Sequence, residues 1–171
     1  MKQLLASLVV LSLVLIPALA ADNTFVSKEF KFSVVFPPDA KVLPLQESSE
    51  GSLWAIGYIG PSDDQPQWAG KVQILPVAAG STDEASMNES LNHGSLSDAV
   101  DRKLTTCHGL PALRFSVPEN PSDDSPWTAY VGLVVLSRAN NRTYVVVAAS
   151  IGSKKYNSKS EAFINSFKVL K

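Results

Sequence analysis

Two short acidic segments are the residues of this sequence whose types and spacing point to chemistry. Pro61-Ser62-Asp63-Asp64 recurs further along the chain as Pro121-Ser122-Asp123-Asp124, and each copy is followed by a proline and a tryptophan, Trp68 in the first and Trp127 in the second. Carboxylate oxygens are the ligands that hard cations prefer. If both segments lie at the same side of a sheet, four carboxylates and two aromatic rings form a site for a cation or a polyol.

The same residue types also suit hairpin loops that bind nothing. Proline fixes φ, and Ser and Asp side chains hydrogen-bond to their own backbone, so both segments are predicted to be turns between strands. Calcium loops usually contain a glycine at the sharp turn, and neither segment has one. The metal therefore stays unknown. The candidate ligand-binding or partner-binding residues are Asp63, Asp64, Trp68, Asp123, Asp124 and Trp127.

The single cysteine is predicted to be a free thiol. His108 follows Cys107 directly, and neighbouring side chains of an extended segment point to opposite faces, so His108 is poorly placed to activate the thiol. His93 reaches it only through the fold, and its expected role is at a helix C-terminus. Motifs such as G-x-S-x-G, H-E-x-x-H and C-x-x-C do not occur. We therefore assign no catalytic residue, and expect Cys107 to be half-buried beside a turn, or to pair with another molecule.

Composition limits the classes of partner and cofactor. The 171 residues include 15 basic and 16 acidic side chains without a basic run, which argues against nucleic acid as a partner. One cysteine makes no internal disulfide, and no cofactor is expected. The length favours one domain, predicted to be a monomer.

The first twenty residues have the pattern of a secretory signal peptide. Lys2 precedes an apolar run, Leu4–Ile16, and the segment closes with small residues at Ala18 and Ala20. We expect residues 1–20 to be removed, leaving residues 21–171 as a periplasmic or secreted protein without a stable membrane anchor. The alternative is an anchor that is retained at the N-terminus, which Pro17 disfavours.

Periodicity predicts at least six strands. Large apolar residues alternate with others from Phe30 to Phe36, so that one face of a strand carries three phenylalanines and a valine. Nearly continuous apolar runs near the end of the chain are typical of central strands covered on both faces. The further predicted strands are Leu53–Ile59, Lys71–Pro76, Ala112–Val117, Thr128–Leu136 and Thr143–Ile151.

Three stretches show helical signals. A capping box at Ser81-Thr82-Asp83-Glu84 predicts a helix that ends at Gly94. Apolar residues at helical spacing predict a second short helix over Leu96–Leu104, and a repeat of the capping spacing at Ser158 and Glu161 predicts a closing helix. The element order indicates an α+β fold with a mostly antiparallel sheet covered by helices. A cystatin-like or nuclear-transport-factor-like curved sheet is the alternative, but those folds usually begin with a helix.

Three segments resemble PsbP-like proteins. Glu29–Pro37 is similar to their aromatic opening strand, Gly109–Arg114 to their Gly-x-Pro-Ala element, and Ile164–Lys168 to their closing helix. The resemblance implies an α/β/α sandwich of the PsbP-like or DcrB-like type and an exported accessory protein without catalysis. It carries over no site residues, because the matching positions lie in turns and the core.

The leading functional hypothesis is thus an exported, noncatalytic protein that binds a protein partner or a small ligand through loops at one end of the sheet. The alternative is a calcium-type metal-dependent binder or hydrolase that uses the two Asp-rich loops, with His93 or His108 as further contributors.

Overall fold

The computed structural model describes residues 23–47, 52–61, 67–77, 79–93, 96–118, 129–150 and 154–171. The predicted signal peptide, residues 1–20, lies outside this part of the chain and stays a prediction. Within the described ranges, no helix has the length and apolar character that crossing a bilayer requires.

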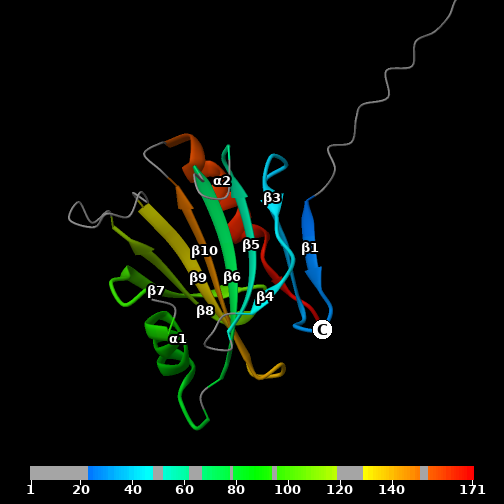
Figure 1. The fold of residues 1–171 in the computed structure, drawn as a ribbon. Coiled ribbons are helices and arrows are strands. Elements are labelled where there is room, and N and C mark those ends of the chain that lie inside the picture. Colours follow the sequence, from blue (N-terminus) through cyan, green and yellow to red (C-terminus); the bar gives the residue numbers. More distant parts are fainter. Residues whose placement is uncertain are drawn as a thin grey trace, which may run out of the picture.

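An eight-stranded sheet forms the centre of the fold, and its neighbouring strands are all antiparallel (Figure 1). In spatial order the strands are β3 (Lys41–Val42), β5 (Leu53–Ile59), β6 (Trp68–Pro76), β10 (Arg142–Ser150), β9 (Ala129–Ser137), β8 (Leu110–Val117) and β7 (Val100–Cys107), while β4 (Gln46–Glu47) also pairs with β5. The predicted α+β class with a mostly antiparallel sheet is confirmed.

Strand β10 shows why the sequence is apolar on both faces of the sheet. Tyr144, Val146 and Ala148 point into one core, and the intervening Val145 and Val147 point into another. Side chains alternate across a strand, so a strand buried on both faces needs apolar residues at successive positions. The continuous apolar run in this segment therefore predicted a central strand correctly.

The first core is covered by a second, three-stranded sheet and a helix. The small sheet contains β1 (Thr24–Ser27), β2 (Phe32–Val35) and β11 (Lys168–Val169), and the helix is α2 (Lys154–Ser166). Aromatic rings join these layers, with the ring centroids of Phe32 and Phe167 5.9 Å apart and those of Phe36 and Phe163 5.0 Å apart. Such pairs stabilise beyond the burial of their area.

Helix α1 (Asp83–His93) covers part of the opposite face, where Met87 and Leu91 pack into the second core. Its main contacts are with β8, β9 and β10. The predicted α/β/α sandwich is therefore too simple, because α1 covers only part of one face and α2 shares the other with the small sheet. The helix begins as expected, but the capping side chain is Thr82, whose Oγ1 accepts the Ala85 N–H at 3.2 Å, rather than Ser81.

The predicted helix over Leu96–Leu104 is wrong. Its first residues form turns, in which the Leu96 N–H donates to the Leu91 carbonyl and the Ala99 N–H to the Leu96 carbonyl. From Val100 the chain is strand β7, although Asp101 has a φ of 51° and the register with β8 shifts between Val100 and Lys103. The pairing of β7 with β8 overrides a helical spacing that rests on few residues.

Two predicted boundaries also differ. Phe30 and Lys31 lie in the turn before β2 rather than in a strand, and Lys31 has a φ of 56°, so the predicted strand from Phe30 to Phe36 is too long. The closing helix begins at Lys154, before the predicted capping residue Ser158. Strand β5, Leu53–Ile59, has the predicted bounds.

Candidate functional site

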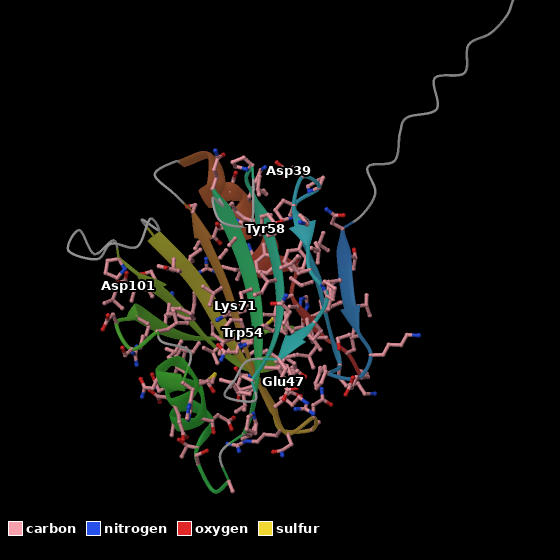
Figure 2. All side chains as sticks on the ribbon, viewed as in Figure 1. Asp39, Glu47, Trp54, Tyr58, Lys71 and Asp101 are labelled. Atoms are coloured by element: carbon pink, nitrogen blue, oxygen red, sulfur yellow. The ribbon has the colours of Figure 1, made fainter. Side chains whose placement is uncertain are left out.

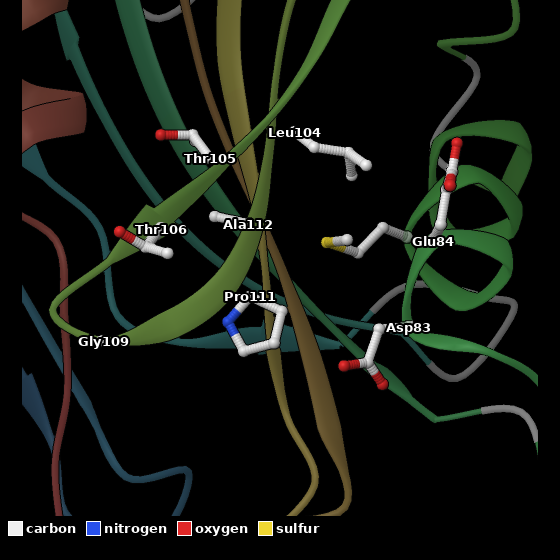
Figure 3. Close-up of a pocket in the computed structure, with 9 residues that line it drawn as sticks. Asp83, Glu84, Leu104, Thr105, Thr106, Gly109, Pro111 and Ala112 are labelled. Carbon is white, nitrogen blue, oxygen red and sulfur yellow. The ribbon is translucent and has the colours of Figure 1, made fainter.

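A groove of about 360 Å³ lies between the start of α1 and the β7–β8 hairpin (Figure 3). Figure 3 shows Glu84 on the helix side of the groove and Leu104 on the strand side, with the Leu104 side chain directed toward the helix. The residues that matter most for its chemistry are Asp83, Glu84 and Met87 on the helix, and Leu104, Thr106 and Pro111 on the strands. Its floor is apolar and its helical rim is acidic.

The hairpin sets the strand side of the groove. His108 and Gly109 connect β7 to β8 with φ values of 49° and 83°, the two positive values of a type I′ turn. Leu104 stands opposite Leu113, which belongs to the core under α1, so Leu104 lies on the face that carries α1. Its side chain nonetheless remains 54% exposed, because α1 does not reach over it.

The helix side carries two carboxylates, those of Asp83 and Glu84, which differ in their ion pairing. Arg138 holds Asp83, with its Nη2 3.0 Å from Oδ1, and also donates to the Ser81 carbonyl at 2.6 Å. For the carboxylate of Glu84, no ion-pair partner exists among the described residues. Both acids suit the positive end of the helix dipole. The charge of Glu84 is therefore available to a bound cationic group.

The thiol of Cys107 lies at the end of β7, on the face opposite Leu104, where it packs against the first core. It is half-buried, its Sγ is 3.7 Å from the carbonyl oxygen of Phe167, and burial raises the pKa of the thiol. His108 lies in the hairpin turn and His93 is at the end of α1, near Glu89 at 3.9 Å. A thiol with a raised pKa is a weak nucleophile at neutral pH.

The six residues predicted from the acidic segments have different outcomes. Trp68 is fully buried, and its indole Nε1 donates to Ser160 Oγ at 3.0 Å, so its assignment as a partner-binding residue is wrong. Its ring fills the core between β6 and α2. The other five, Asp63, Asp64, Asp123, Asp124 and Trp127, lie outside the described residues and stay predictions.

The topology does meet one condition for a shared acidic site. Strands β5 and β8 are separated in the sheet by three strands, all antiparallel to their neighbours, so β5 and β8 run in the same direction. The last residues of these strands, Ile59 and Val117, therefore lie at the same end of the sheet. Among the described residues, no three His, Cys, Asp or Glu side chains gather closely enough to hold a metal.

A second polar feature lies on β5 and β6, where Figure 2 labels Trp54 and Lys71 side by side. The Lys71 Nζ is 4.0 Å from the centre of the Trp54 ring, and burial lowers the pKa of the ammonium. Gln73, which is opposite Trp54 in the register, is buried, and its Oε1 accepts no hydrogen bond from the part of the chain that the structure describes. Trp54 and Lys71 pack against each other on strands β5 and β6, whereas the groove is lined by α1, β7 and β8, so the two features are separate.

Sequence reasoning missed Leu104 and Met87 as groove residues. Leu104 was placed in a helix, although Thr105 and Thr106 favour a strand and His108-Gly109 has the positive-φ preference of a hairpin turn on its second residue. Met87 carried no signal of its own, since a buried methionine on a helix is ordinary core.

These features define an α+β domain with a large antiparallel sheet, two dissimilar faces and an apolar groove with an acidic rim. No protein-family model matches the chain, and no curated protein is similar to it. Solved structures of Mog1 proteins share its fold. A mutant of the protein Mog1 superposes with a TM-score of 0.54 at 12% identity, covering 87% of this chain and 96% of that one.

The Ran-binding protein Mog1p of Saccharomyces cerevisiae superposes with a TM-score of 0.52 at 12% identity, covering 88% of this chain and 97% of that one. At 12% identity, these superpositions show that the fold is shared and show nothing about a shared function.

The comparison corrects three expectations. The resemblance to PsbP-like and DcrB-like exported domains is wrong, because the two solved structures described above are Mog1 proteins. The function that followed from it, an exported accessory protein of PsbP-like type, is wrong for the same reason. The periplasmic or secreted location is also corrected, because neither neighbour is described as exported and one is described as Ran-binding.

Proposed function

We propose that this domain binds another protein, and that a segment of the partner occupies the groove between α1 and the β7–β8 hairpin. The observation that carries the proposal is Leu104, a large apolar side chain that is 54% exposed at the edge of an apolar cavity. Covering the exposed half of this side chain stabilises a complex by about 1–1.5 kcal/mol, roughly half of the value for burying a fully exposed leucine.

The groove favours a protein segment with one long apolar side chain. Met87 and Pro111 line the same cavity as Leu104 and give it apolar walls, and the volume of about 360 Å³ is at the lower end for ligand sites. An aliphatic side chain entering there is enclosed by α1 and the hairpin, which is the setting of an interface hot spot.

The rim favours a positive charge in the partner. Asp83 is already neutralised by Arg138, whereas Glu84 has no such partner among the described residues. A Lys or Arg beside the apolar anchor completes the pair, and electrostatic complementarity of this kind gives specificity and faster association. The partner segment is therefore basic as well as apolar.

The fold neighbours support a protein partner. One of them is described as a Ran-binding protein, and the matched region spans nearly all of that chain. A shared fold does not transfer a partner, so the identity of the bound protein is decided by the groove.

A cation-binding role for the two acidic segments is the second candidate. It is favoured by the common direction of β5 and β8, since the two acidic segments follow these strands in the sequence and both strands end at the same end of the sheet. Titration of Ca²⁺ into the full chain by calorimetry tests this role, with the fourfold Asp→Asn variant at Asp63, Asp64, Asp123 and Asp124 as the control. Absence of heat with the wild-type chain contradicts it.

Photo-crosslinking tests the protein-binding proposal. We place p-benzoylphenylalanine at Leu104 and, as a matched control, at Val26, whose exposed fraction of 52% is nearly the same but which lies on the small sheet. In cells that make the chain naturally, we expect a defined adduct from position 104 that is absent from position 26 and reduced by Glu84→Lys. Equal adducts from both positions, or none from position 104, contradict the proposal.

A further inference from the structure

Strand β7 is an outer strand of the large sheet, and part of its backbone has no partner among the described residues. Cys107 and Leu110 flank a two-residue turn and therefore exchange backbone hydrogen bonds. Counting back from this pair, Thr105 also directs its N–H and C=O toward β8, whereas Leu104 and Thr106 direct theirs outward. Within the described part of the chain, no strand pairs with this outer edge.

The two halves of this edge differ. In the first half, Asp101 has a φ of 51°, accepts a hydrogen bond from Ser116 Oγ at 2.7 Å, and lies within the irregular register. Bulges and charges of this kind block the addition of another strand. Arg102 is also fixed there by bonds to the Ala99 and Ser97 carbonyls. From Leu104 to Thr106 the strand is regular and has neither protection.

The unprotected half borders the groove. Leu104 and Thr106 lie on the face that carries α1, and both line the cavity. A strand placed about 4.8 Å beyond β7 directs every second side chain onto that same face. A long side chain on that face can reach past Leu104 toward the groove, where the Glu84 carboxylate has no ion-pair partner among the described residues.

We infer that the partner segment binds in extended form as an additional antiparallel strand along Leu104–Thr106, with an apolar side chain in the groove and basic side chains two positions away on either side. This inference rests on the proposed function and specifies how the groove is occupied. In such complexes backbone hydrogen bonds supply affinity, and side-chain pockets supply specificity. The outward groups of Leu104 and Thr106 supply the backbone part, and the groove with Glu84 supplies the side-chain part.

A peptide with a palindromic sequence provides the test, because its side chains occur in the same order whichever direction it binds in. The probe is acetyl-Thr-Lys-Thr-Leu-Thr-Lys-Thr-amide, in which the leucine and both lysines share one face. In an antiparallel pair, residues opposite the outward-directed Leu104 and Thr106 bond to them and share their face. N-methylation of the peptide's Lys, Leu and Lys residues therefore removes the bonds to β7, while N-methylation of its internal Thr residues does not.

Binding to the full chain is measured by fluorescence anisotropy with a labelled probe, and the site is located by NMR shifts of the Leu104 and Thr106 amides. We expect methylation at Lys, Leu and Lys to weaken binding by more than about tenfold, and methylation at Thr to change it by less than about threefold. Leu104→Arg abolishes binding, whereas Val26→Arg, at an equally exposed site, leaves it unchanged.

Equal weakening by the two methylation patterns overturns strand addition, and the proposed function stands if Leu104→Arg still abolishes binding. The inference is also overturned if the unmodified probe does not bind, or if sedimentation shows that β7 is covered by a second copy of the chain in a dimer that Leu104→Arg dissociates. In either case, the photo-crosslinking experiment with p-benzoylphenylalanine at position 104 still tests whether the groove binds a protein partner.

Discussion

The indole N–H of Trp68 on β6 donates to the hydroxyl of Ser160 on α2 at 3.0 Å, inside the core. Both side chains are fully enclosed, so the bond joins the central sheet to its covering helix where water cannot replace it. The position of Trp68 after an acidic segment predicts an exposed side chain near a hairpin loop. The side chain instead packs inside the core and stabilises the fold.

Trp68→Phe is expected to destabilise the protein by about 1–3 kcal/mol, because it leaves the buried Ser160 hydroxyl unpaired and opens space beside Phe163. The free energy of unfolding in urea measures this loss. Trp54→Phe is the matched control, since the Trp54 indole also donates to a serine, Ser52, but is only partly buried. A smaller loss at Trp68 than at Trp54 contradicts the assignment.

Gly132→Ala is expected to destabilise the protein by about 1–3 kcal/mol. A Cβ at this position overlaps the end of the Phe115 ring, which is almost fully buried on the adjacent strand β8. Phe115→Leu shortens the side chain that the new Cβ overlaps. The double variant should therefore lose less stability in thermal unfolding than the sum of the losses of the two single variants. If the double variant loses as much as the sum of the two single variants, the overlap is not the cause.

The Cys107 thiol is expected to react slowly with iodoacetamide at neutral pH, and the midpoint of its rate profile should lie above the ordinary thiol pKa of 9.0. The folded protein holds this proton more tightly than the unfolded chain, so the thiol lowers the free energy of unfolding as pH rises beyond 9.0. Alkylation rates in the folded chain and in denaturant test this directly. A midpoint at or below that of the denatured chain contradicts the burial that the structure shows.

Lys71 should make the opposite contribution. Burial lowers the pKa of its ammonium below 10.5, so the unfolded chain keeps the proton to higher pH and the free energy of unfolding rises as pH approaches 10.5. Lys71→Met removes this dependence and replaces the ammonium beside Trp54 with an uncharged side chain of similar length. The difference between wild-type and variant stability, measured in urea at several alkaline pH values, isolates the effect from that of Cys107. A difference that is constant with pH contradicts it.

Sequence periodicity predicted the elements that the core itself determines. Strand β5 and helix α1 have the expected bounds, because the apolar spacing of Leu53–Ile59 and the capping sequence before Asp83 are local signals. Strand β7 could not be found in this way. Every residue from Val100 to Thr106 is exposed, so the strand has no alternation of buried and exposed positions, and its apolar residues fit a helix as well.

The groove could not be predicted from the sequence, because its residues come from helix α1 and from the β7–β8 hairpin, which are brought together only by the tertiary fold. Met87 and Leu104 belong to a helix and to a strand whose proximity depends on how α1 crosses β8–β10. The repeat of the acidic segments attracted attention instead, since it is visible along the chain. Of that set, Trp68 shows how burial can reverse an interpretation based on residue type.

The charge at Glu84 permits the most direct test of the central claim, that a basic, apolar segment occupies the groove. Glu84→Lys is compared with Glu47→Lys, an equal charge change at an exposed residue that Figure 2 labels. Glu47 lies on β4, which pairs with β5, four strands away from β8 and five from β7 in the sheet. The affinity of each variant is measured for the Thr-Lys-Thr-Leu-Thr-Lys-Thr probe and for its counterpart with Glu in place of Lys.

Glu84→Lys should weaken the lysine probe about threefold to fivefold and strengthen the glutamate probe by a similar factor, as expected for one exposed ion pair, while Glu47→Lys should change neither. Equal responses of the two probes to Glu84→Lys, or equal effects of the two substitutions, would contradict the claim that the groove is the binding site.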